Sequence, residues 1–129
     1  MSKFLLSLND TELANQVSSI LIQNNFEVIG EPNLEKDFAQ VKEAKPDFVI
    51  MSIMDNESKN WKLHSQLRTS HEIEQLPVLV IASRSHKYDK LPGLVSTRLD
   101  DYVTYPFDLD DFLLRIRYLL DRATSMKQT

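Results

Sequence analysis

The sequence predicts an α/β fold in which helices cover both faces of a doubly wound parallel sheet. Five short apolar runs recur along the chain, and polar or helix-like segments separate them. The third and fourth runs are nearly continuous in large apolar residues, as is typical of strands that are buried on both faces. Because crossover connections between parallel strands share one hand, helices are expected on both sides of a three-layer sandwich. The runs span residues 4–8, 26–30, 47–53, 77–83 and 101–105.

Three of the intervening segments have amphipathic patterns that predict helices. Asp10 or Thr11 can accept hydrogen bonds from the free amides at the start of the first helix, and Asn33 can do so for the second. The second helix is expected to end just before Pro46, since the residue ahead of a proline avoids helical backbone angles. The third is expected over residues 58–68.

The C-terminal part of the chain predicts a long final helix that Asp108 caps. Its basic residues lie toward its end, where the helix dipole favours positive charge. Pro92 and Gly93 interrupt the preceding segment, residues 83–99, and should break or shorten any helix there. The apolar stripe of the final helix is predicted to consist of Leu109, Phe112, Leu113, Ile116 and Leu120.

Composition and charge exclude several classes of function. The chain has 129 residues, the size of one ordinary domain, and its net charge of −4 argues against binding nucleic acid unaided. It has no cysteine, which excludes thiolate sites, and only two glycines, which excludes a glycine-rich phosphate loop. No apolar segment approaches the ~18 residues of a membrane span, so we expect a soluble cytoplasmic protein without membrane contact.

A site in such a fold lies beyond the carboxyl ends of the central strands, where the winding reverses. In this chain those ends are the positions after Leu8, around Ser52, around Ala82-Ser83 and at Tyr105. Ser52 is the one hydroxyl in a largely apolar stretch, DFVIMSIMD, that ends on a carboxylate. The pattern therefore predicts a buried serine at the tip of a central strand.

Three stretches carry a resemblance to the receiver domain of two-component response regulators. They are KFLLSLNDTELANQVSSILIQNNFEV (residues 3–28), KPDFVIMSIM (residues 45–54) and LDDYVTYPFDLDDFLLRIRYLLDR (residues 99–122). The resemblance covers residues 3–122 and implies a flavodoxin-like sheet of five parallel strands in the order 2-1-3-4-5. We therefore expect a receiver-like domain over residues 1–122 and a polar tail, or the start of a linker, over residues 123–129.

The resemblance also implies a chemistry that this sequence has lost. An active receiver carries phosphate on an aspartate at the end of the third strand, beside an acidic pair that holds Mg²⁺, a hydroxyl and a lysine. Here the aspartate position is Ser52, the acidic pair is Leu8 and Asn9 with Asp10 the remaining carboxylate, the hydroxyl is Ala82 or Ser83, and the lysine is Tyr105. The sequence therefore predicts a pseudo-receiver that is not an enzyme, uses no metal or cofactor, and signals through protein partners without phosphorylation.

Other interpretations of the same pocket stay open. Asp10 or Asp55 could accept a phosphoryl group in a modified pocket, or the cleft could bind a small ligand. A hydrolase would need a base within hydrogen-bond reach of Ser52, and no spacing links any of the three histidines to it. His64, on the third predicted helix, is expected to be a partly buried structural residue.

The last strand and helix resemble a contact surface. In receivers of winged-helix transcription regulators, the face made by the fourth helix, fifth strand and fifth helix pairs two subunits through charged residues. Asp100, Asp101, Arg115 and Arg117 stand at comparable positions, so a symmetric homodimer is one expectation and a solvated charged face is the alternative. Tyr102 occupies the position of the switch aromatic of active receivers, and we expect it to hold one rotamer.

Overall fold

The strands form one parallel sheet in the order β2-β1-β3-β4-β5. A computed structural model describes residues 2–54, 58–70, 73, 75–83 and 99–127 of the chain. Its element order and strand order confirm the flavodoxin-like α/β fold that the sequence predicts. The strands are β1 (Lys3–Ser7), β2 (Glu27–Ile29), β3 (Phe48–Ile53), β4 (Val78–Ser83) and β5 (Asp100–Tyr105).

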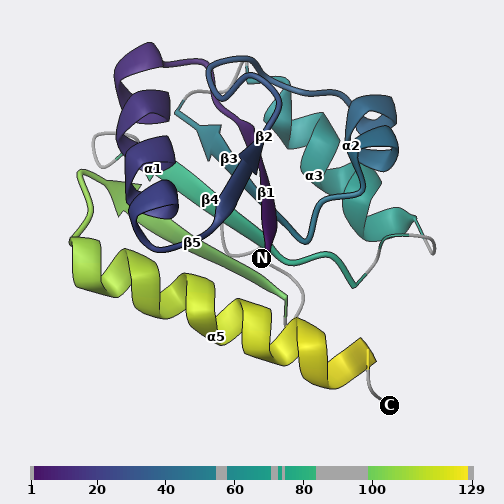
Figure 1. Cartoon of the computed structure of the whole chain (residues 1–129). Coiled ribbons are helices and arrows are strands. Elements are labelled where there is room, and N and C mark those ends of the chain that lie inside the picture. The colour runs from purple at the N-terminus through teal and green to yellow at the C-terminus, as the bar shows by residue number, and fades with distance from the viewer. Residues whose placement is uncertain (1, 55–57, 71–72, 74, 84–98, 128–129) are drawn as a thin grey trace.

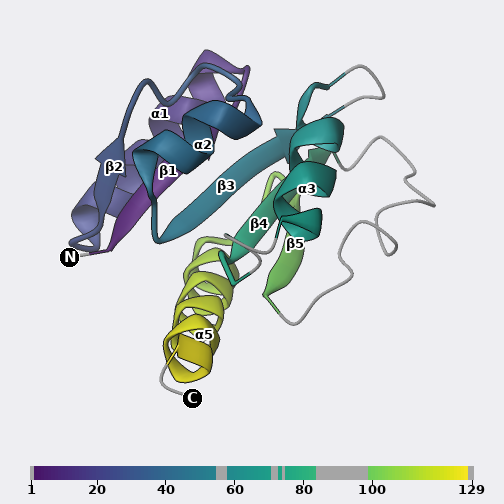
Figure 2. The ribbon, with the colours of Figure 1, turned by 90° about the vertical axis from the view of Figure 1, so that its right-hand side faces the viewer.

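The described helices cover the two faces of the sheet (Figures 1 and 2). On one face lie α1 (Thr11–Gln23) and α5 (Leu109–Lys127), and on the other lie α2 (Phe38–Ala44) and α3 (Asn60–Thr69). Each face buries an apolar cluster. The first core, against α1 and α5, includes Phe4, Leu8, Leu13, Val17, Phe48, Ile50, Ile81, Phe112 and Ile116. The second core, against α2 and α3, includes Leu5, Val41, Val49, Met51, Leu63, Leu67, Val80 and Ala82.

The central strand β3 is buried along its whole length, which explains why its sequence reads as an almost continuous apolar run. Its side chains alternate between the two cores. In the first core Phe4 pairs with Phe48 across the β1–β3 register, and their stacked rings have centroids 4.8 Å apart. These contacts fix the height of β1 relative to β3 and hence the positions of the residues at their carboxyl ends.

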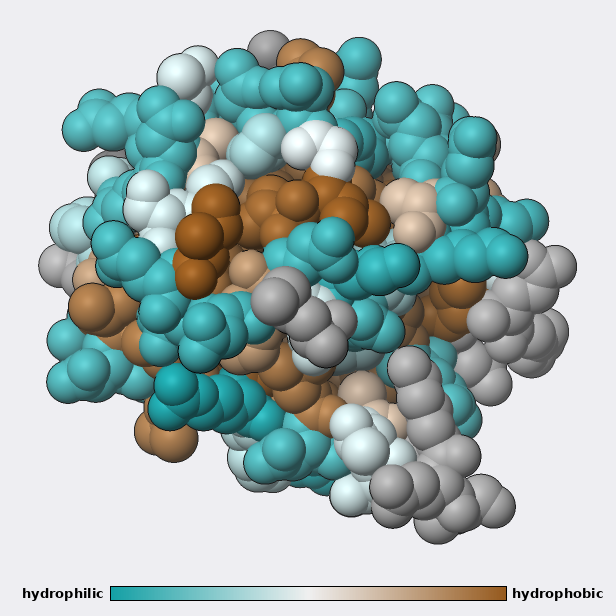
Figure 3. All heavy atoms as spheres, in the orientation of Figure 1, coloured by the Kyte–Doolittle hydropathy of each residue, from teal (hydrophilic) through white to brown (hydrophobic). Residues whose placement is uncertain are grey.

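The strand β2 lies at an edge of the sheet, as its more alternating pattern indicates. Val28 and Ile29 are only half-buried. Figure 3 shows hydrophobic side chains gathered over β2 and β1, between hydrophilic side chains on either side.

The helix α1 begins as predicted, because the Asp10 carboxylate accepts a hydrogen bond from the Leu13 amide at 2.9 Å. The predicted start of α2 at Asn33 is wrong. Asp37 and Gln40 form a capping box there, each side chain accepting a hydrogen bond from the other residue's amide, so the helix begins at Phe38. It ends as expected before Pro46, at a left-handed Lys45.

The helix α5 is capped by Asp108, as predicted, and continues to Lys127. Residues 123–127 therefore continue this helix, in place of the expected polar tail or start of a linker. The reason is that Ala123 extends the buried stripe of Phe112, Ile116 and Leu119 by one more turn. Leu109, predicted in that stripe, is 48% exposed in the first turn of the helix.

The segment expected to hold a broken fourth helix, residues 84–98, lies outside the described residues, so the labels pass from α3 to α5. Among the helices of the described part of the chain, none is long and apolar enough to cross a membrane.

Candidate functional site

The carboxyl ends of the central strands meet at one edge of the sheet, and Ser52 lies there on β3. Ile50 and Met54, two residues before and after it, belong to or pack against the first core, so strand alternation directs Ser52 to that face. Its side chain is almost fully buried, and its hydroxyl has no hydrogen-bond partner in the described part of the chain. Ser52 thus has the buried position that the sequence predicts, with apolar neighbours along the strand.

The residues after β1 do not form an acidic pair. Leu8 is completely buried in the first core. Asn9 is exposed, and its side-chain amide donates to the Glu35 carboxylate at 3.5 Å. Asp10 is also exposed, and its carboxylate caps α1. Within the described residues there is no group of three or more His, Asp or Glu side chains that could hold a metal ion.

Strand alternation distinguishes the two candidates for the hydroxyl position at the end of β4. Ala82 is buried in the second core, on the opposite face of the sheet from Ser52. Ser83, one residue later, points to the face of Ser52 and pairs in register with Tyr105 on β5. The hydroxyl candidate on the correct face is therefore Ser83.

Tyr105 fills space beside the first core without adding charge. Its ring packs against that core and meets Phe107 edge to face, with centroids 5.8 Å apart. Its hydroxyl donates to the Gln16 side chain of α1 at 3.4 Å. The lysine position of the family thus holds an aromatic residue that leans toward α1.

A buried polar network on the other face of β1 was not predicted from the sequence. The Ser7 hydroxyl donates to the Asn60 side-chain carbonyl at 2.7 Å. The Asn60 side-chain amide donates to the backbone carbonyls of Ser7 and Ser52, both at 2.7 Å. Because all three residues are buried, these bonds join β1, β3 and the first turn of α3 out of contact with water.

Lys36 joins this network from the segment that leads into α2. Its backbone amide donates to the Ser7 hydroxyl at 2.7 Å. Its side chain is 8% exposed, and the ammonium donates to the Leu6 carbonyl at 2.9 Å and to the carbonyls of Glu31 and Leu34. Burial lowers the pKa of Lys36, and the nearby charge of Glu31 offsets part of that shift.

Comparisons with known proteins agree with this architecture. The chain is 29% identical over 126 residues to the response regulator ArlR of Staphylococcus saprophyticus, covering 95% of this chain and 54% of that protein. It is 27% identical over 128 residues to the DNA-binding dual master transcriptional regulator RpaA of Synechocystis, covering 99% of this chain and 53% of that protein. No protein family model matches the chain.

A solved structure shows the same fold. The signal receiver domain of a signal transduction histidine kinase from Syntrophus aciditrophicus superposes with a TM-score of 0.73 at 17% identity, covering 94% of this chain and 91% of that one. The chain is thus similar in sequence to response regulators and has the fold of a receiver domain. The domain spans about half the length of the two relatives named above.

Asp100, expected on the surface, is instead buried at the start of β5. Arg68 of α3 donates to its carboxylate from Nε at 2.8 Å and from Nη2 at 2.6 Å, and His64 Nε2 lies 3.3 Å away. Burial raises the pKa of Asp100, but the hydrogen bonds and charges of His64 and Arg68 outweigh it and leave the pKa below its usual value. Asp100 is therefore an internal anchor for α3, and His64 is the structural residue that was expected.

Two of the four charged residues expected at an interface do lie together on the surface. Arg115 donates from Nη1 to both carboxylate oxygens of Asp101 at 2.9 Å and from Nε to Asp111 at 2.9 Å. These carboxylates raise the pKa of Arg115 above its usual value. Arg117 turns the other way and reaches Asn24 of α1 at 3.4 Å. Asp101 and Arg115 are therefore the pair that a partner could meet.

Tyr102 and Asp55 are the two remaining residues expected near this site. Tyr102 is 37% exposed, so its ring is not buried in the core of the domain. Asp55, expected beside the pocket as an alternative acceptor, lies outside the described residues.

Removing the Asn60 side chain is expected to destabilise the domain. Asn60→Ala removes the acceptor of the Ser7 hydroxyl and a side-chain donor to two buried strand carbonyls. We therefore expect a loss of about 2–4 kcal/mol in the free energy of unfolding. Urea unfolding followed by circular dichroism measures this loss. The matched control is Asn9→Ala, at an exposed asparagine, for which a change within about 0.5 kcal/mol is expected. Equal losses for the two variants would contradict the role assigned to Asn60.

Asp100→Asn is expected to change how stability depends on pH. The folded-state pKa of Asp100 lies below its unfolded value of 3.8, so its stabilisation is present above about pH 3.8 and is lost as pH falls through the folded-state value. Because the variant removes the buried negative charge that balances Arg68, we expect it to be about 3–5 kcal/mol less stable near neutral pH. Urea unfolding between pH 2 and pH 7 should show that the difference in unfolding free energy between the wild type and the variant becomes smaller in acid. A difference that does not change with pH would contradict the lowered pKa of Asp100.

Proposed function

We propose that this receiver domain is a signalling module that acts through protein–protein contact and is not switched by aspartyl phosphorylation. The observation that carries the proposal is Ser52, a buried and unpartnered hydroxyl where active receivers have a solvent-accessible aspartate. Leu8 of the core and Tyr105 occupy the positions of a metal ligand and of the balancing lysine. This is the receiver fold without its phosphoryl-transfer groups.

Each replacement removes a separate requirement of the chemistry. Phosphoryl transfer depends mainly on placing positive charge around the transferred group. Leu8 offers no oxygen to a divalent cation, and Tyr105 offers no charge to a phosphate. A serine hydroxyl without an adjacent base is a poor nucleophile near neutral pH. Ser52 is also only 2% exposed, which leaves little surface for a small ligand in the same place.

The proposal predicts that the protein stays unmodified when a phosphoryl donor is supplied. After incubation with acetyl phosphate and Mg²⁺, intact mass spectrometry is expected to show the mass of the unmodified chain. A phospho-adduct at stoichiometric yield would overturn the proposal.

Matched variants make that experiment decisive. Leu8→Asp, Ser52→Asp and Tyr105→Lys, combined in one chain, restore three of the groups that active receivers use and provide a positive control for the donor. If the wild-type chain is modified instead, Asp10→Asn and Asp55→Asn identify which carboxylate accepts the phosphoryl group. Loss of the adduct in either variant would establish the alternative of an active receiver with a modified pocket.

Response regulator relatives imply signalling partners for this chain, and we propose a second copy as one of them. The β5–α5 face displays the Asp101–Arg115 pair, and three of the larger exposed hydrophobic residues, Tyr102, Leu114 and Tyr118, lie on the same two elements. In a symmetric contact, Arg115 of each copy would meet Asp101 of the other in place of its own. We propose a cytoplasmic location for this module, because the response regulators that it resembles act in the cytoplasm.

The homodimer has a charge-reversal test. Sedimentation equilibrium of the wild-type chain is expected to show dimers that Asp101→Arg or Arg115→Asp weakens, since each change places like charges opposite each other. The two substitutions combined are expected to restore the dimer. A monomer mass for the wild-type chain up to sub-millimolar concentration would exclude this partner.

A further inference from the structure

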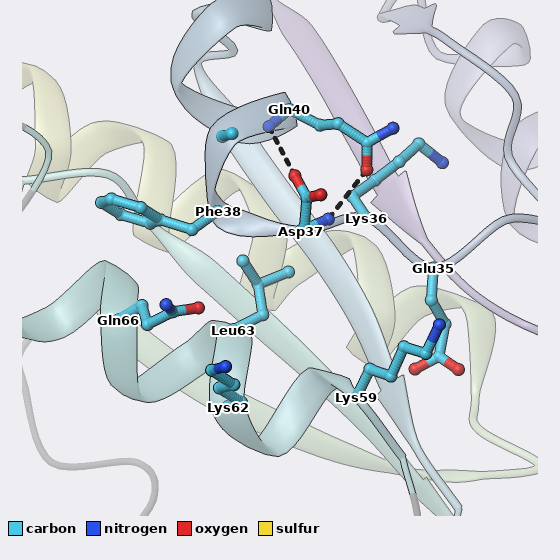
Figure 4. Close-up of a pocket in the computed structure, with 10 residues that line it drawn as sticks. Glu35, Lys36, Asp37, Phe38, Gln40, Lys59, Lys62, Leu63 and Gln66 are labelled. Carbon is cyan, nitrogen blue, oxygen red and sulfur yellow. Dashed lines mark hydrogen bonds between the residues drawn. The ribbon is translucent and has the colours of Figure 1, made fainter.

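A groove on the opposite face of the sheet from α5 has the chemistry of a peptide-binding surface. It lies between residues 35–40, which lead into α2, and the first two turns of α3, and its volume is about 610 Å³. Figure 4 shows Phe38 and Leu63 in its middle, with Lys59 and Lys62 along the α3 side. The groove therefore combines an apolar centre with a positively charged wall.

The positive charges of that wall are not neutralised within the described part of the chain. Lys59, the residue that precedes α3, and Lys62, in its first turn, are exposed. Neither has a carboxylate of a described residue within ion-pair distance. The two acids on the opposite wall keep their charge, and their carboxylates are hydrogen-bonded within the chain. The Glu35 carboxylate accepts from the Ser58 hydroxyl at 2.9 Å, and Asp37 accepts from the Gln40 amide at 2.8 Å. A ligand thus finds free ammonium groups on the α3 side.

Both walls are held in place by the buried polar network. Lys36, in the middle of the 35–37 segment, is fixed by its amide on the Ser7 hydroxyl and by its ammonium on three backbone carbonyls. Asn60 fixes the first turn of α3 to the same strand. A groove whose walls are already ordered costs a ligand little conformational entropy to occupy.

We propose that this groove binds a segment of a partner protein that carries an apolar side chain flanked by carboxylates. The apolar side chain would pack against the half-buried ring of Phe38, with the buried Leu63 beneath it as the floor of the groove, and the carboxylates would pair with Lys59 and Lys62. Charge complementarity selects an acidic segment over a basic one. This inference deepens the proposed function, on which it rests, because it gives the chemical class of a partner for a module that works by contact.

The test selects ligands without assuming a sequence. A random heptapeptide display library is panned on the immobilised full-length chain, and selected peptides are then measured by the fluorescence of Trp61. That residue is the one tryptophan of the chain and lies on α3 between the two lysines. We expect the selected peptides to share Asp or Glu residues around a Leu, Met or Phe.

Charge-matched variants then locate the binding site. Lys59→Gln combined with Lys62→Gln is expected to weaken the selected peptides about tenfold or more, since both ion pairs are lost. Lys3→Gln combined with Lys45→Gln makes the same change in net charge outside the groove and is expected to leave affinity within about twofold. No enrichment, enrichment of basic peptides, binding that ignores the Lys59 and Lys62 substitutions, or saturable binding of inorganic phosphate alone would each overturn the inference.

The two proposals fail separately. A phospho-adduct in the acetyl phosphate experiment would refute contact-only signalling and leave the peptide measurements intact. A groove that selects no acidic peptide would refute this class of partner, and the outcome of the acetyl phosphate experiment would still stand.

Discussion

The side chain of Asn60 makes the contact on which the rest of the site depends. It binds the last residue of β1 and the tip of β3 at once, and Ser7 passes the same network to Lys36. Polar groups in this position would be costly if they were left unpaired, because burial removes the water that would otherwise satisfy them. The network thus sets where α3 begins, where the chain enters α2, and how the two central strands are aligned at their ends.

On the other face of the same strands the side chains are mostly apolar. Leu8 and Tyr105 pack with or against the first core, and the buried Ser52 hydroxyl has no hydrogen-bond partner among the described residues. The carboxyl edge of the sheet therefore has two different halves. On one face of the sheet the edge continues the hydrophobic core through Leu8 and Tyr105. On the other face it consists of the buried hydrogen bonds of Ser7, Lys36 and Asn60.

The features that follow from periodicity were predictable from the sequence. Continuous apolar runs predicted β3 and β4, and Asp10 and Asp108 were correctly placed as helix caps. The features that depend on one tertiary contact were not. Nothing in the pattern marks Lys36 as buried, because its partners are backbone carbonyls that come together only in the fold. Asp100 looked like a surface charge because Arg68 and His64 lie far from it in sequence, and the extra turns of α5 depended on one small residue, Ala123.

The ion pair between Arg68 and Asp100 also links two elements of the fold. It ties the last turn of α3 to the first residue of β5 through a buried, charged link that cannot be broken without a large cost. The same helix carries the lysines of the groove at its other end, and the same strand carries the exposed Asp101. A displacement of β5 would therefore act on α3 directly, because the two elements share this buried ion pair.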